Sequence, residues 1–94
     1  MEEFKGTKGN WSYSQETGTI RGEGGLLAEL LINGSEDHNG TLMAAAPELL
    51  EALQCLFENY KQLADSGDAG NWRLEDEPAG KKALHAINKA LGKD

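Results

Sequence analysis

The chain has 94 residues, the length of a single domain with a modest core of its own. Its 16 acidic residues outnumber its 9 basic ones, and the formal net charge is −7. Because so acidic a chain has no general basic face, the sequence excludes a duplex DNA-binding protein. The acidic start is followed by no apolar segment of signal-peptide type, and no run is long enough to span a bilayer. We therefore expect a cytoplasmic protein with no membrane partner.

Three short segments predict a β-meander near the start of the chain. Trp11–Ser14 alternates aromatic and small polar residues, as a half-buried strand does. After a turn at Gln15–Gly18, a returning strand is predicted at Thr19–Arg21. Glycines at Gly22–Gly25 interrupt the pattern before the apolar run Leu26–Ile32. We interpret this run as a strand because it is short and bounded by glycines, although Leu, Ala and Glu also favour a helical turn.

The strongest signal is helical and covers Thr41–Ala64. Pro47 interrupts it, because proline lacks an amide hydrogen and disfavours helical backbone in the preceding residue. The sequence therefore predicts a short helix from Asn39 to Ala45, then a kink or break. A longer helix follows with Pro47 in its first turn, where proline is tolerated. A last helix is predicted over residues 78–91, packed on the long helix as an antiparallel pair.

These elements predict an α+β fold, with a short antiparallel sheet followed by a kinked long helix and a C-terminal helix. We expect one domain over residues 1–94, with the sheet and a loop in residues 1–38 and a helical hairpin in residues 39–94. The long helix has apolar residues on two adjacent stripes, more than one partner helix and a thin sheet can cover. We therefore expect a homo-oligomer. The stripes consist of Leu49, Leu53, Leu56, Tyr60 and Leu63 in one, and Leu50, Phe57 and Ala64 in the other, and the predicted interface residues are Leu50, Phe57 and Tyr60.

The sequence contains no recognisable catalytic or metal-binding motif. Cys55 lies within the apolar part of the long helix, and we expect it to be a small buried hydrophobic residue. His38 stands next to Glu36 and Asp37, a grouping typical of a solvated turn, and His85 is expected on the surface of the last helix. We therefore expect no enzyme, no metal and no cofactor.

One candidate binding site lies before the last helix. Trp72 and Arg73 combine an aromatic face with a guanidinium group, which together can stack on a base and bind a phosphate. Lys81 and Lys82 follow in the first turns of the last helix, near its positive end. The alternative is that Trp72 caps the helix pair and Arg73 pairs with a neighbouring acid.

A second candidate site lies at the predicted start of the short helix. There, His38, Asn39 and Thr41 surround backbone amides that are expected to be free and so to favour an anion. The alternative is simple capping of the helix by Asn39.

Three segments of the chain carry a family resemblance. Residues 39–53 read NGTLMAAAPELLEAL, residues 4–11 read FKGTKGNW and residues 86–92 read AINKALG. They resemble the central helix, the opening and the closing helix of a widespread family of small phage and prophage proteins. Part of the wider group is similar to Thoeris anti-defence proteins, oligomers that sequester cyclic nucleotide immune signals without cleaving them. The resemblance implies that the Asn39 end of the first helix and a later basic residue line a pocket between protomers.

The leading hypothesis is a phage counter-defence protein in the host bacterial cytoplasm. As a homo-oligomer it would capture a nucleotide-type signalling molecule without catalysis. The predicted ligand-binding residues are Asn39, Trp72, Arg73, Lys81, Lys82, His38 and Thr41. The alternative is an acidic protein–protein inhibitor of a host defence complex such as CRISPR, or of a replication complex, or a phage accessory protein with another role.

Overall fold

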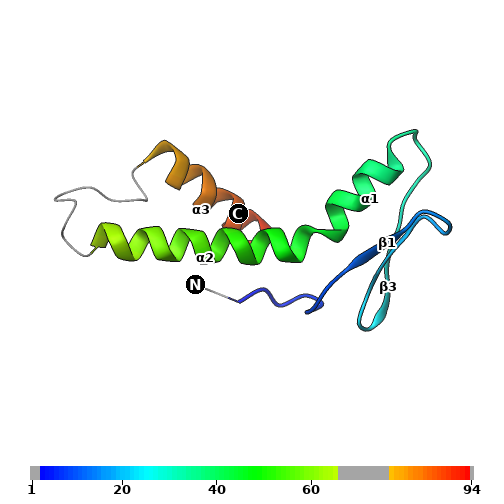
Figure 1. The fold of residues 1–94 in the computed structure, drawn as a ribbon, viewed down its shortest axis with the longest axis horizontal. Coiled ribbons are helices and arrows are strands. Elements are labelled where there is room, and N and C mark those ends of the chain that lie inside the picture. Colours follow the sequence, from blue (N-terminus) through cyan, green and yellow to red (C-terminus); the bar gives the residue numbers. More distant parts are fainter. Residues whose placement is uncertain (1–2, 66–76, 94) are drawn as a thin grey trace. The chain divides into compact units, whose positions relative to one another are not determined.

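The computed structural model describes residues 3–65 and 77–93. Over these residues the chain forms a small antiparallel sheet followed by helices, which confirms the predicted α+β class (Figure 1). The elements are β1 (Ser12–Ser14), β2 (Thr19–Gly22), β3 (Gly25–Glu29), α1 (Glu36–Ala44), α2 (Ala46–Asp65) and α3 (Pro78–Ala90).

The chain divides into two compact units. One is Phe4–Leu49, which holds the sheet and α1. The other holds α2 from Leu50 onward, all of α3, and Glu3 from the N-terminal end of the chain. The prediction of a single domain, with the sheet and the helical hairpin meeting after residue 38, stays a prediction.

The sheet is a meander in which β2 is the central strand. Tyr13 on β1 lies opposite Ile20 on β2, and Ile20 lies opposite Ala28 on β3. The predicted turn between β1 and β2 is confirmed: Gly18 adopts a φ of 65°, and its amide donates to the Ser14 carbonyl at 2.9 Å. A side chain would be strained at this φ, so glycine suits the position.

The third apolar run is a strand only in its first part. β3 ends at Glu29, which is paired with Thr19, and the Leu30 amide still donates to the Gly18 carbonyl at 2.8 Å. Pairing stops there because the chain before Thr19 is the turn that leads back to β1. The strand interpretation is therefore confirmed for residues 26–29 and wrong for Leu31 and Ile32, which follow the strand.

Helix α1 packs on β1 and β2 within the first unit. Ile20, 2% exposed, and Thr19, 6% exposed, are buried on β2. Gly40 is the buried residue of α1 and lies against the Tyr13 ring: a Cβ added at Gly40 would fall 2.4 Å from that ring. The absent side chain therefore sets how closely the helix can approach β1.

The start of α1 differs from the prediction. The helix begins at Glu36, with Ser35 at its N-cap position, and the predicted start at Asn39 is wrong. Glu36 and Asp37 occupy the first turn, where carboxylates interact favourably with the positive end of the helix. This acidic pair, predicted to be a solvated turn, is already helical.

The predicted break before Pro47 is confirmed. Helix α1 ends at Ala44, and Pro47 lies in the first turn of α2. The Ala45 amide closes the first helix with bonds to the carbonyls of Thr41 (3.2 Å) and Leu42 (3.1 Å), and the Ala45 carbonyl accepts from the Leu49 amide at 2.9 Å. Ala45 thus ends one helix and begins the hydrogen bonding of the next.

In the second unit, α3 returns along α2 in the opposite direction, so the predicted antiparallel pair is confirmed (Figure 1). Phe57 on α2 is 5% exposed and Ile87 on α3 is 1% exposed. Helix α3 ends where predicted: Gly92 has a φ of 78°, and the Lys93 amide donates to the Asn88 carbonyl at 2.8 Å. This is the hydrogen bonding of a glycine-terminated helix.

The prediction that Cys55 is buried is wrong. Its side chain is exposed on α2, whereas Phe57 faces the interior. Two residues correspond to a rotation of about 200° around a helix, so a residue two positions from an inward-facing one points away from the core. The apolar composition around Cys55 concealed this phase difference.

The contact between Gly40 and Tyr13 yields a stability prediction. Alanine is favoured over glycine in a helix by about 1 kcal/mol, but the added methyl group has no room beside the ring. We expect Gly40→Ala to lower the free energy of unfolding by about 1–2 kcal/mol, as overpacking does, measured by chemical denaturation. In a Tyr13→Ala background the same change should be neutral or stabilising. Equal losses in both backgrounds would contradict the packing argument.

Candidate functional site

Of the predicted phosphate-binding group, the structure describes only the two lysines. Lys81 and Lys82 are exposed in the first turn and a half of α3, and that helix has no acidic residue in its first turn. Trp72 and Arg73 lie outside the described residues. The structure therefore places two cations near the positive end of a helix, and their predicted ligand role stays a prediction.

The second predicted site falls within α1. His38, Asn39 and Thr41 are all exposed, but the Asn39 amide donates to the Ser35 carbonyl at 2.9 Å. The hydroxyl of Thr41 donates to the Asp37 carbonyl at 2.7 Å. The expectation of a free amide at Asn39 is therefore wrong, because the helix begins earlier than predicted. A binding role for these three side chains stays a prediction.

The turn before α1 is organised by a carboxylate of the chain itself. Glu36 accepts hydrogen bonds from the amides of Asn33 (3.1 Å) and Gly34 (2.8 Å), and the Ser35 amide donates to the Asn33 side chain at 2.8 Å. Bonds from its own amide and from those of Asn33 and Gly34 lower the pKa of Glu36. The anionic group at this helix start is therefore supplied by the protein.

A second polar contact joins β1 to α1. The Tyr13 hydroxyl donates to the Asp37 carboxylate at 2.8 Å. This hydrogen bond, with smaller effects of burial and of the negative charges on Asp37 and Glu36, raises the pKa of Tyr13 to about 12. Tyr13 thus contacts α1 twice, through its ring at Gly40 and through its hydroxyl at Asp37.

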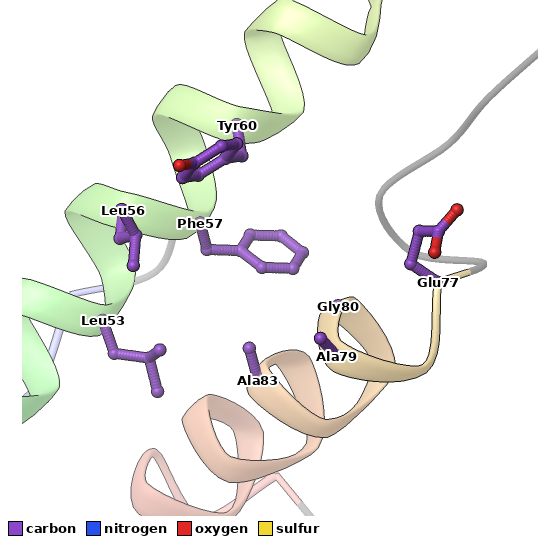
Figure 2. A pocket seen from close by; sticks show the side chains of 8 residues that line it. All are labelled: Leu53, Leu56, Phe57, Tyr60, Glu77, Ala79, Gly80 and Ala83. Atoms are coloured by element: carbon purple, nitrogen blue, oxygen red, sulfur yellow. The ribbon is translucent and has the colours of Figure 1, made fainter.

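The second unit contains an apolar groove of about 360 Å³ between α2 and α3 (Figure 2). The ring of Phe57 projects from α2 toward the start of α3, where Ala79 and Gly80 leave space for it. The lining of the groove is apolar apart from the Tyr60 hydroxyl and Glu77. The groove is lined by Leu53, Leu56, Phe57, Tyr60, Glu77, Ala79, Gly80 and Ala83. This lining suits an apolar side chain and offers no cation for a phosphate.

The predicted interface residues differ in how much surface they leave exposed. Phe57 is 5% exposed and so offers little surface to an oligomer, and its predicted place in an interface stays a prediction. Leu50 is half-buried, and Tyr60 is 50% exposed. Among the described side chains of the two predicted stripes, Phe57 is buried and Leu50 is half-buried, whereas Leu49, Leu56, Tyr60 and Leu63 are exposed.

Sequence reasoning missed the most exposed apolar residues of the described chain. Leu31 is 87% exposed and Ile32 is 90% exposed. The sequence pattern predicts them at the end of a strand, where alternate residues would be covered. The Asn33-Gly34-Ser35 turn directly after them was the available signal, because a strand that ends earlier leaves the residues before a turn in solvent.

Within residues 3–65 and 77–93 no group of histidine, cysteine or carboxylate side chains is placed to hold a metal ion. In that same part of the chain, none of the helices combines the length and the apolar character that crossing a membrane requires.

A family model described as Salmonella phage P22 protein Y8K6 matches residues 1–94. The chain belongs to this phage protein family. The match covers all of the sequence, including the three segments that resemble small phage proteins, and so confirms the phage assignment. No curated protein and no solved structure matches the chain significantly.

The contact between Tyr13 and Asp37 can be tested by titration. In a Tyr60→Phe background, which leaves a single tyrosine, we expect Tyr13 to ionise with a pKa of about 12. Because the folded pKa is raised, the contact contributes stability below pH 10, the ordinary tyrosine value, and loses it as the pH rises through 12. Asp37→Asn should lower the pKa toward its ordinary value, as followed by ultraviolet absorbance. An unchanged value would contradict the contact.

Proposed function

We propose that this phage protein works by binding another protein, without chemistry of its own, and that Leu31 and Ile32 form the contact. The observation that carries the proposal is the near-complete exposure of these two adjacent residues, 87% and 90%. Single exposed apolar residues are common on protein surfaces, but paired, highly exposed ones are typical of interaction sites.

The two residues are held between ordered segments. On one side the Leu30 amide is bonded to the Gly18 carbonyl at the end of the sheet. On the other, the Glu36 carboxylate binds the amides of Asn33 and Gly34. Because both ends are fixed, less conformational entropy is lost when Leu31 and Ile32 enter a partner's pocket.

The charges near this apolar tip, Leu31 and Ile32, indicate the chemistry of the partner. Glu29 at the end of β3 and Asp37 in α1 are exposed, Glu36 is half-buried, and the whole chain has a net charge of −7. The matching surface is an apolar pocket with a basic rim, because opposite charges at the rim speed association and exclude other partners. This fits the sequence-based alternative of an acidic inhibitor of a protein complex.

The test replaces both tip residues. Leu31→Ser/Ile32→Ser should weaken binding to a protein captured from host lysate and then purified by at least about 30-fold, the loss expected for an interface hot spot. The circular dichroism spectrum and melting temperature of the double variant should match those of the parent protein, because both side chains are almost fully exposed.

Leu42→Ser is the matched control, since Leu42 in the same unit is also an exposed leucine, at 63%. It should bind like the parent protein, and raising the salt concentration should slow association of both. If the double variant retains full affinity for the same purified partner, the contact lies elsewhere.

Capture of a nucleotide signal is a second candidate. It rests on the sequence resemblance to the cyclic nucleotide sponges and on Trp72 and Arg73. The exposure of Lys81 and Lys82 near the positive end of α3 favours it. The family description names a phage protein and no ligand.

Calorimetric titration with a panel of cyclic nucleotides separates the two candidates. If the second is correct, one nucleotide binds, and Arg73→Ala and Lys82→Ala each weaken it at least tenfold. Lys89→Ala, at the other end of α3, should leave binding unchanged. Absence of binding across the panel, with the protein partner retained, would exclude nucleotide capture in favour of protein binding.

A further inference from the structure

One face of α2 presents a regular apolar seam. Leu53, Leu56, Tyr60 and Leu63 are separated by three, four and three residues, the spacing of the a and d positions of a coiled coil. Leu53 is half-buried, whereas Leu56, Tyr60 and Leu63 are 53%, 50% and 65% exposed. A helix face with this spacing packs against another helix, and much of this one faces solvent.

Helix α3 occupies a different face of α2. Phe57, which points at α3 in Figure 2, is 5% exposed. It is one residue beyond Leu56, a rotation of about 100° around the helix axis. The α2–α3 contact therefore uses the Phe57 side of α2, and Leu56, Tyr60 and Leu63 each keep at least half of their surface exposed. Leu56 and Tyr60 border both surfaces, since they also line the groove in Figure 2.

We propose that this seam is where a second copy of the chain binds, through its own seam, to give a two-fold symmetric dimer. The proposal concerns the second unit alone and does not depend on the partner of Leu31 and Ile32. A two-fold contact requires a surface that can face itself, and this seam meets that requirement in its charge and in its apolar character.

The charge around the seam allows two identical chains to meet. Although the chain carries a net charge of −7, the seam has no charged residue, and the adjacent positions Ala52 and Asn59 are uncharged. The nearest acids on α2, Glu51 and Glu58, are at positions that face away from an a/d seam. A surface rich in acidic residues would bring like charges together when two copies meet, which costs association free energy.

The exposed area of the seam is less than half that of a standard interface, which corresponds to a weak dimer. With about 150–250 Å² for a large side chain in full, the exposed parts of Leu56, Tyr60 and Leu63 amount to roughly 350 Å² per copy. A standard interface buries about 800 Å² per partner. The rim of the α2–α3 groove, which begins at Leu56 and Tyr60, would supply further contact to the incoming helix.

The test introduces charge at the middle of the seam. In parallel pairing Leu56 faces its own copy, and in antiparallel pairing centred on the seam the two lie about one helical turn, roughly 6 Å, apart along the axis. We expect light scattering to give a dimer mass for the parent protein at tens of micromolar. Leu56→Glu should raise the dissociation constant at least tenfold. Gln62→Glu adds the same charge at an exposed α2 position outside the seam and should leave the dimer intact.

A charge-swap experiment shows that the partner is the seam itself. Leu56→Glu and Leu56→Lys should each be monomeric, and an equimolar mixture should form a heterodimer. In a Cys55→Ala background and under oxidation, Leu56→Cys should form a disulfide-linked dimer if the pairing is parallel, and Leu56→Cys mixed with Tyr60→Cys should do so if it is antiparallel. Gln62→Cys should form neither. A monomeric parent protein at 100 μM, or a Leu56→Glu dimer as tight as the parent's, overturns the proposal. If Leu56→Glu loses its circular dichroism spectrum, the disulfide experiment decides instead, and failure of both disulfide pairs to form overturns the proposal.

Discussion

The missing amide hydrogen of Pro47 is the constraint on which the arrangement of the chain depends. A continuous helix from Glu36 to Asp65 would have to satisfy the packing of the sheet and of α3 at once. Because Pro47 has no amide hydrogen to donate to the helical hydrogen-bond ladder, α1 ends at Ala44 and packs on the sheet, while α2 packs with α3. The boundary between the two compact units falls only a few residues later, between Leu49 and Leu50.

In each unit, small residues allow a helix to pack closely against an aromatic ring. In the first, Gly40 lets α1 come close enough to β1 for the Tyr13 ring to cover the helix backbone. In the second, Ala79 and Gly80 make room for Phe57. Few large side chains are buried in the described residues, and much apolar surface stays outside, at Leu31 and Ile32 in one unit and along the seam in the other. That surface is the physical basis of the proposed binding role.

The parts of the fold that follow from local rules could be predicted from the sequence. The break at Pro47, the end of α3 at Gly92 and the turn at Gly18 each depend on one residue with restricted or unusual backbone freedom. What could not be predicted was the phase of each element relative to its neighbours. The interior of α2 is defined by where α3 lies. The sequence therefore did not show that Phe57 is more buried than Leu56, or that Cys55 faces outward.

The candidate site was harder to predict for the same reason. Asn39 is a good capping residue, but Ser35 and the acids after it compete for the same role, and the helix begins there. Leu31 and Ile32 look like the end of a strand until the strand order shows that β2 has no residues left to pair with them. The lysines of α3 were predicted at the correct end of the helix. Their predicted role in ligand binding depends on Trp72 and Arg73, which lie outside the described residues.

The hydrogen bonds of Glu36 have a consequence for how the apolar tip behaves in acid. The pKa of this carboxyl is lowered from its ordinary value of 4.5, so the stabilisation from its hydrogen bonds with the amides of Asn33 and Gly34 is fully present above pH 4.5. That stabilisation is lost only as the pH falls through the lower folded-state pKa. The hydrogen-bonded turn that follows Leu31 and Ile32 is therefore insensitive to the small pH changes of a living cell.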